Sequence, residues 1–242
     1  MENLHLILPE IFISLSIMFL LILGVFKKDS TVWINNCSLI ILFIAAVITF
    51  NETLSIEKTF LFKGSVIVDY FSSLMKIITL LAAFIVLSIS INYLKIFNLS
   101  KIEYPVLILS SVLGMMVMIS SNDLIVFYMG LELQSLALYV LATFNRDNLK
   151  SSEAGLKYFV LSALSSGLLL YGCSLIYGFT GSTNFNIIAT QLSSNEYALT
   201  FGIVFILVGL AFKITAVPFH MWAPDVYEGS PTTVTLFFTM VP

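Results

Sequence analysis

Charge is scarce in this chain. Charged residues make up 10% of its 242 residues, whereas soluble domains carry about 25%. Hydrophobic residues make up 59% and are spread along the whole length, which excludes a soluble domain held by one anchor. The composition therefore predicts an all-α fold, a polytopic transmembrane helix bundle that forms one membrane domain over 1–242 within a lipid bilayer. No basic cluster suggests nucleic acid as a partner.

Cysteine and histidine are rare too, with two residues of each type. Cys37 and Cys173 fall in apolar segments without CxxC spacing or nearby histidines, which argues against a metal or iron–sulfur site. We expect both to be small apolar core residues, and we expect no cofactor in this chain. The first residues carry no positive charge and no small-x-small cleavage site follows them, so the first apolar stretch is not expected to be a signal peptide.

Long apolar runs are what the chain has in abundance. A helix needs about 20 such residues to cross a bilayer. The seven complete predicted spans are approximately 6–26, 32–50, 70–93, 105–120, 124–144, 154–178 and 198–217. We expect an eighth span to begin near Pro231 and to be cut off at Pro242.

The segments between the spans carry weaker signals. We expect a short hairpin at 60–68, a tight turn at 121–123 and a short interfacial helix at 187–192. Positive residues gather in the loops after spans one, three and five, which predicts that these loops face the cytoplasm or the mitochondrial matrix and that the N-terminus lies on the outer side. The residues concerned are Lys27, Lys28, Lys95, Lys101, Arg146 and Lys150. A bacterial inner membrane and a mitochondrial inner membrane both fit this pattern.

Two charged residues lie deep inside predicted spans, where such residues are expensive and usually functional. Glu132 stands about halfway along the fifth span, and Lys213 about two-thirds along the seventh, five residues before Pro218. A carboxyl group held between burial and a nearby cation can load and release a proton, and a lysine removed from water can accept one. Gln134 and Ser135 could support water beside Glu132. The alternatives are a glutamate hydrogen-bonded for packing and a lysine that reaches back to the interface.

Lys157, two turns into the sixth span, has two interpretations. It follows Glu153 by four residues, the spacing of a helix-surface ion pair, so it could form such a pair near the membrane interface. It could instead face Glu132 and tune the affinity of that carboxyl group for protons.

His220 follows the proline that interrupts the seventh span. Histidine changes charge near neutral pH and suits a proton relay, but a lone histidine is as often a hydrogen-bonding or interface residue. Residues 222–228 are expected to form a re-entrant loop or an interface anchor. For Glu10 and Lys76, near helix ends, we favour snorkelling or local pairing.

Three segments share their residues and their order with a known family. They are Gly209-Leu-Ala-Phe-Lys-Ile-Thr-Ala-Val-Pro-Phe-His-Met-Trp-Ala-Pro-Asp-Val-Tyr-Glu-Gly-Ser-Pro231, Gly130-Leu-Glu-Leu-Gln-Ser-Leu136 and Glu153-Ala-Gly-Leu-Lys-Tyr-Phe159. They resemble the antiporter-like membrane subunits of respiratory complex I, the proton-pumping NADH:quinone oxidoreductase. The stretch Pro-Asp-Val-Tyr-Glu-Gly is most similar to the NuoN type. The resemblance covers nearly the whole chain.

The resemblance implies a longer protein of about fourteen helices with two inverted repeats, each holding a discontinuous helix and a buried charge. This chain would be the N-terminal half, with the seventh helix discontinuous. Glu132 and Lys213 would form the central pair of the first repeat, Lys157 would modulate it, and His220 would extend the polar axis. The further buried lysine that the family usually has in the eighth helix is not present here.

The preferred function is therefore proton translocation within NADH:quinone oxidoreductase. NADH oxidation and quinone reduction would take place in other subunits, and the partners would be neighbouring complex I membrane subunits, including antiporter-like ones. The first alternative is a subunit of a cation/proton antiporter complex. A purely structural membrane subunit and a membrane-bound hydrogenase subunit are the others. The Pro-Asp-Val-Tyr-Glu-Gly stretch favours the respiratory subunit.

Overall fold

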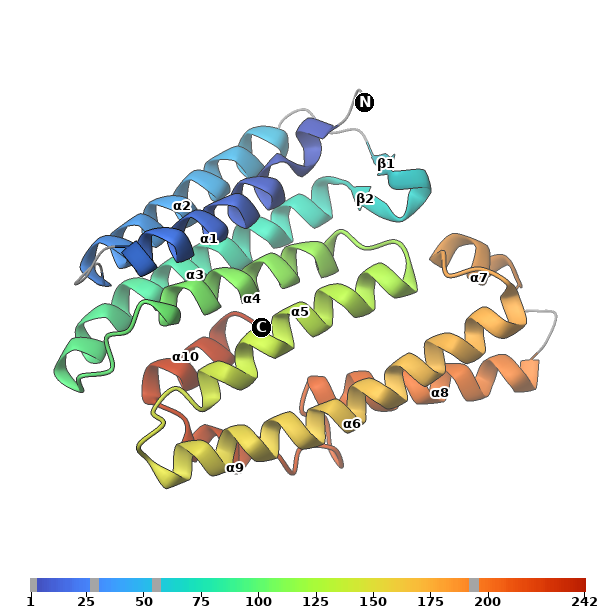
Figure 1. The fold of residues 1–242 in the computed structure, drawn as a ribbon. Coiled ribbons are helices and arrows are strands. Elements are labelled where there is room, and N and C mark those ends of the chain that lie inside the picture. Colours follow the sequence, from blue (N-terminus) through green and yellow to red (C-terminus); the bar gives the residue numbers. More distant parts are fainter. Residues whose placement is uncertain (1–3, 27–30, 54–57, 192–195) are drawn as a thin grey trace.

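The computed structural model describes residues 4–26, 31–53, 58–191 and 196–242, and this part of the chain is mostly helical (Figure 1). The long helices are α1 (Leu8–Phe26), α2 (Thr31–Thr53), α3 (Tyr70–Ile96), α4 (Glu103–Ile119), α5 (Leu124–Ala142), α6 (Leu149–Thr180) and α8 (Glu196–Lys213). The shorter helices are α7 (Phe185–Gln191), α9 (Ala223–Gly229), α10 (Thr232–Met240) and two 3-10 turns, at Leu4–Ile7 and Phe62–Gly64.

The seven predicted spans coincide with α1 to α6 and α8, and their ends differ by a few residues. Helix α6 begins at Leu149, before the predicted start at 154, because the Asn148 side chain accepts a hydrogen bond from the backbone N–H of Lys150 and caps a polar first turn. Helix α8 ends at Lys213, before the predicted end at 217, because the chain leaves the helical conformation at Thr215, whose φ is 57°, and Pro218 prevents the helix from resuming there. The interfacial helix expected at 187–192 is α7, and residue 192 lies outside the described residues.

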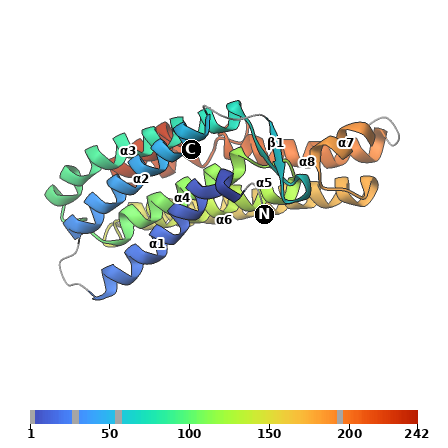
Figure 2. The same cartoon turned by 90° about the horizontal axis from the view of Figure 1, so that it is seen from above.

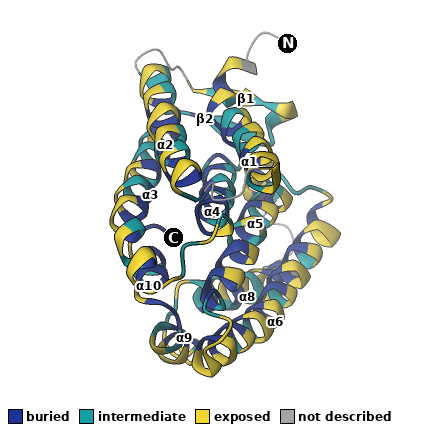
Figure 3. Ribbon diagram, turned by 60° about the vertical axis from the view of Figure 1, so that its left-hand side comes forward, coloured by how far each residue is buried: buried dark blue, intermediate teal, exposed yellow. Residues whose placement is uncertain are grey.

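Five helices in the described part of the chain are long and apolar enough to cross a membrane, namely α1 with the turn before it, α2, α3, α5 and α6. The helical segments Glu103–Ile119 and Leu199–Lys213 are apolar but shorter. The outer faces of the bundle are exposed (Figure 3), and they carry large apolar side chains such as Leu15, Phe19 and Val25. Helices that are apolar on their exposed faces are suited to lipid, where water is absent.

The helices form two groups that meet at α5. Helices α1 to α4 pack around one another, α4 lies along α5, and α6 lies along α8 (Figures 1 and 2). The short helix α9 packs against α6, while α10 packs against α3 and touches α5. The last helices thus return towards the middle of the molecule, so that α5 lies between two helix layers.

Three loops that are far apart in the sequence join at one end of the bundle. The predicted hairpin is present, with β1 (Thr59–Leu61) antiparallel to β2 (Val66–Val68). Between them Gly64 adopts a positive φ of 90°, a conformation that glycine takes readily. Its carbonyl accepts a hydrogen bond from the side chain of Asn122 in the tight turn (2.8 Å) and another from Asn184 before α7 (3.0 Å). These bonds fix where α5 begins.

Candidate functional site

The ammonium of Lys213 lies among hydroxyl groups at the end of α8. Its Nζ donates hydrogen bonds to Ser162 Oγ (2.8 Å), Ser135 Oγ (2.9 Å) and the Tyr139 hydroxyl (3.0 Å). A lysine ammonium has three N–H donors, so these hydroxyls satisfy all of them. The side chain is 11% exposed, and therefore it does not reach back to the interface. The hydroxyls take the place of water around a buried charge.

Glu132 lies on the neighbouring helix α5 and faces this ammonium. Its Oε1 is 3.5 Å from Lys213 Nζ, and it accepts a hydrogen bond from Ser166 on α6. The side chain of Glu132 is 21% exposed. A proton that passed from Lys213 to Glu132 would convert two opposite charges into two neutral groups, so the net charge of the site would stay the same. Such an exchange avoids the large cost of an unpaired charge in a low dielectric.

The hydroxyls around Lys213 are also linked to one another. Tyr139 accepts a hydrogen bond from Lys213 and donates one to Ser162 Oγ (2.6 Å). Because a hydroxyl can donate and accept at the same time, Tyr139 and Ser162 can pass a proton along as well as hold the ammonium. The site therefore contains a carboxylate, an amine and a connected set of hydroxyl groups.

Close backbone contact between α4 and α5 positions Glu132. A Cβ atom on Gly114 would lie 2.5 Å from the backbone N of Gln134, and one on Gly130 would lie 2.7 Å from the backbone N of Met118. Real Cβ atoms do not approach other atoms so closely, so only glycine fits at these two positions. The α5 backbone is therefore held against α4. This contact fixes the rotation of α5 about its axis, and so the direction in which Glu132 points.

Helices α6 and α8 are also in close backbone contact at glycine residues. A Cβ atom on Gly172 would lie 2.7 Å from the carbonyl oxygen of Gly202. Near the end of α8, Ser165 Oγ donates a hydrogen bond to the carbonyl of Gly209 (3.1 Å). These contacts hold the α6 serines beside Lys213.

Lys213 is the last residue of α8, where the helix dipole favours a positive charge. Beyond it the chain turns, with Thr215 at a φ of 57°. The indole Nε1 of Trp222 then donates a hydrogen bond to the carbonyl of Phe212 (3.0 Å), which satisfies one of the free carbonyls at the helix end. The Trp222 ring stacks on Tyr158 of α6, with 4.5 Å between the ring centroids. The turn is thus anchored, and Lys213 has a fixed position.

A cavity of about 450 Å³ adjoins the amine of Lys213. Its polar lining residues include Gln134, Ser135, Thr215 and Tyr158. Gln134 Oε1 is buried without a hydrogen-bond partner in the described part of the chain. A cavity of this size with several polar groups can hold water.

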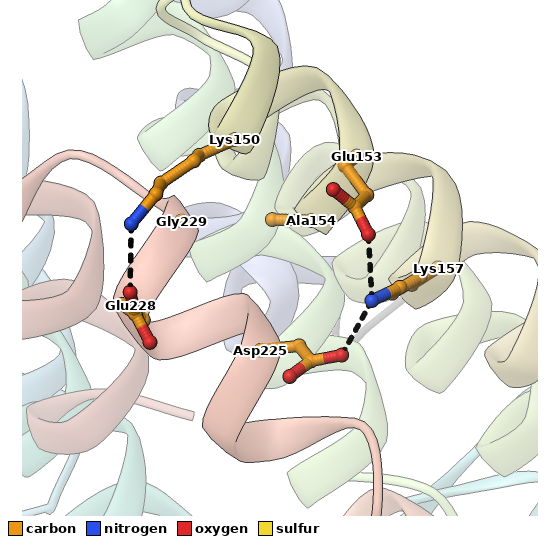
Figure 4. A pocket seen from close by; sticks show the side chains of 7 residues that line it. All are labelled: Lys150, Glu153, Ala154, Lys157, Asp225, Glu228 and Gly229. Carbon is orange, nitrogen blue, oxygen red and sulfur yellow. Dashed lines mark hydrogen bonds and ion pairs between the residues drawn. The ribbon is translucent and has the colours of Figure 1, made fainter.

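Lys157 belongs to a different group of charges (Figure 4). Its Nζ lies 2.8 Å from Glu153 Oε1 and 2.6 Å from Asp225 Oδ2 on α9, and Lys150 pairs with Glu228 at 2.9 Å. The side chains in these pairs are 41% to 75% exposed. The predicted ion pair with Glu153 is confirmed. The structure does not bring the ammonium to Glu132, because two nearer carboxylates hold it at the surface.

His220 lies in the turn between α8 and α9 with an exposed side chain. It is not among the residues that line the cavity beside Lys213. Its role in a proton relay therefore stays a prediction.

The family model described as NADH:quinone oxidoreductase/Mrp antiporter, TM, matches residues 121–242 of this chain, the half that contains Glu132 and Lys213. The chain belongs to this NADH:quinone oxidoreductase/Mrp antiporter family. It is an integral membrane protein.

Individual relatives agree with membership of this family. NADH-quinone oxidoreductase subunit N of Pelagibacter ubique is 71% identical over 100% of this chain and 51% of its own length. A chain of respiratory complex I from Thermus thermophilus superimposes with a TM-score of 0.81 at 31% identity, over 96% of this chain and 50% of that one. A chain of the Mrp complex from a Dietzia species has a TM-score of 0.79 at 23% identity, over 97% and 46%, which shows a shared fold. The chain spans about half the length of the curated relatives it matches.

Sequence reasoning missed several members of the site. Tyr139, Ser162 and Ser166 contact the two charges, yet serine and tyrosine are common in membrane helices and do not stand out singly. The available signal was the run of serines at 162, 165 and 166, whose spacing places them on one face of α6.

Glu10 and Lys76 were expected to snorkel or pair locally. The structure shows a pair, but it is a buried one between α1 and α3.

Proposed function

We propose that this chain forms part of a proton-translocating membrane subunit of NADH:quinone oxidoreductase. The observation that carries the proposal is the buried Glu132–Lys213 pair, whose ammonium is surrounded by hydroxyls. The similarity to subunits named NADH-quinone oxidoreductase subunit N along the whole chain supports it. The partners would be other complex I membrane subunits, including antiporter-like ones, and redox chemistry would take place in other subunits, with no redox cofactor in this chain.

In this function Lys213 would hold a proton as an ammonium and pass it on as the pair separates. Approach of a charge from outside the site would weaken the attraction between Glu132 and Lys213, and the hydroxyls of Tyr139 and Ser162 would keep the proton in a hydrogen-bonded network. The cavity at Gln134 would supply water on one side. Lys157 would act indirectly, because its partner Asp225 lies on α9, just after the turn that fixes Lys213.

The interrupted helix fits the same proposal. We take α8, the turn after Lys213 and α9 to be the discontinuous seventh helix of the first of two inverted repeats. His220 in that turn would extend the polar axis. The N-terminus would lie on the periplasmic or intermembrane side, as the loop charges predict.

The test uses the full-length protein in its assembled complex, in inverted membrane vesicles. Glu132→Gln and Lys213→Met remove one charge each at nearly constant size, and proton uptake is measured together with NADH oxidation. We expect proton uptake per NADH oxidised to fall markedly in both variants, because the remaining charge has no opposite charge beside it with which to exchange a proton. Lys101→Met removes an exposed lysine outside the site and serves as the matched control. Parental pumping in both site variants would contradict the proposal.

Exchange of a cation for a proton is the second candidate, since the description of the matching family model names both kinds of protein. Vesicles that carry the full-length protein would then show sodium-dependent proton movement without NADH. The same movement in the Lys213→Met variant would exclude this site as its origin.

A further inference from the structure

A second buried ion pair lies away from the Glu132–Lys213 site. Glu10 Oε1 of α1 is 2.6 Å from Lys76 Nζ of α3, and the two residues are 8% and 3% exposed. Helices α1 and α3 each pack against α2 and α4, so the pair crosses the interior of this four-helix group. Charges at such positions are costly and call for an explanation beyond packing.

The pair is not fully satisfied. Glu10 Oε2 is buried and has no hydrogen-bond partner in the part of the chain that the structure describes. Buried polar atoms nearly always have a partner, and an exception marks strain, a functional role or a bound water or ion. Since Oε1 faces the ammonium, Oε2 is the oxygen of this carboxylate at which a further group can bind.

A third charge completes the cluster. Glu52, near the end of α2, interacts electrostatically with both Glu10 and Lys76 and is only partly buried. Helix α2 ends where α1 and α3 begin, so the three groups share one end of the bundle (Figure 1). Two carboxylates and one ammonium carry a net charge of about −1, which a medium of low dielectric disfavours. One added proton makes the cluster neutral.

We propose that Glu10, Lys76 and Glu52 form a second proton-binding site, which takes one proton from water onto its two carboxyl groups. The proton forms an O–H bond with a carboxylate oxygen, and no other bond in the protein breaks. Glu52 gives protons from water access to the site, because its side chain is partly exposed. Glu10 Oε2 is the buried oxygen at which the proton can be held. This site does not depend on the proposed function.

Within the described residues of α1, α3 and α4, no other ionisable side chain is paired with Glu10 or Lys76. Glu10 is the only one on α1, and His5 on the preceding turn is exposed. On α4 the ionisable residues are Glu103 and Tyr104, which lie at the opposite end of the bundle. At the near end of α3, Asp69 is occupied as the helix cap. The remaining ionisable residues of α3 are Tyr70, Tyr93 and Lys95.

The test is infrared difference spectroscopy of the full-length protein in its complex, between alkaline and neutral pH, a range in which exposed carboxyl groups stay ionised. A protonated carboxyl group gives a C=O band that a carboxylate lacks. We expect a band from this cluster in the parent, with a loss equivalent to one carboxyl group in both Glu10→Gln and Glu52→Gln. Either substitution leaves one carboxylate to match the ammonium, and the cluster is then neutral without a proton.

Two further variants make the result decisive. Glu103→Gln, in an exposed position on α4, is the matched control and should keep the band, and Glu132→Gln should keep it too, because that carboxyl group belongs to the other site. Glu52 is only partly buried, so the Glu52→Gln variant should assemble into the complex even if the Glu10→Gln variant does not. In that case the spectrum of Glu52→Gln alone decides whether the cluster binds a proton. A full-sized band in Glu52→Gln would show that the cluster is a structural ion pair without a proton and would overturn the proposal.

Discussion

Gly114 on α4 provides the sharpest test of how the site is held. A Cβ atom there would lie 2.5 Å from the backbone N of Gln134, 2.8 Å from the carbonyl oxygen of Gly130 and 2.9 Å from the Cα of Gln134. All three atoms belong to the backbone of α5, so no side chain can rotate away. The substitution Gly114→Ala therefore forces α5 away from α4 by roughly 1 Å, since ordinary van der Waals contacts begin near 3.4 Å.

The expected cost follows from two opposing effects. Overpacking costs about 1–3 kcal/mol, and rigid backbone neighbours place this position near the upper value. Alanine recovers about 1 kcal/mol of helix propensity. We expect Gly114→Ala to lower the free energy of unfolding by about 2 kcal/mol. Proton pumping should fall as well, because α5 carries Glu132 and its displacement changes the distance to Lys213.

The measurement is reversible unfolding of the full-length protein in detergent, combined with pumping in vesicles. Gly167→Ala is the matched control, because Gly167 lies on α6 and a Cβ atom there would meet nothing within 4 Å. That variant should be as stable as the parent or slightly more stable. If Gly114→Ala unfolded like Gly167→Ala, the close contact between α4 and α5 would not hold the site, and the reasoning would be refuted.

Two further substitutions test single hydrogen bonds. Tyr139→Phe removes a hydroxyl that accepts from Lys213 at 3.0 Å, so pumping should fall by less than in Lys213→Met, whereas Tyr171→Phe on an exposed face of α6 should pump like the parent. Asn122→Ala removes the 2.8 Å bond to the carbonyl of Gly64 and should cost about 1 kcal/mol of stability. Faster hydrogen exchange of the hairpin amides would report that loss, and unchanged exchange would contradict it.

Much of the helical layout was predictable because the bilayer imposes one rule on every segment. A chain in lipid must satisfy its own backbone, so long apolar runs become helices. Glu132 and Lys213 were predictable for the same reason, since ionisable residues inside such runs are rare and stand out. The hairpin at 60–68 and the turn at 121–123 followed from local sequence.

Partners from distant parts of the chain could not be predicted. Asp225 on α9 forms an ion pair with Lys157, and no local sequence pattern predicts a contact between residues so far apart in the chain. The pair of Glu10 and Lys76 has the same origin, because it depends on how α1 and α3 are rotated within the bundle. The end of α8 depended on the turn before Pro218 and on the indole of Trp222, which caps the Phe212 carbonyl from beyond the helix.

The length of α6 has a consequence for the ion pairs at its start. The helix has 32 residues and rises about 48 Å at 1.5 Å per residue, whereas the hydrocarbon core of a bilayer is about 30 Å thick. Even a strongly tilted helix of this length extends into the headgroup layer. The charged residues of α6 all lie in its first turns, so we expect Lys150, Glu153 and Lys157 to lie at the depth of the lipid phosphates. We then expect the surface potential of the membrane and the salt concentration to act on these pairs directly, and on the more buried Glu132–Lys213 pair much less.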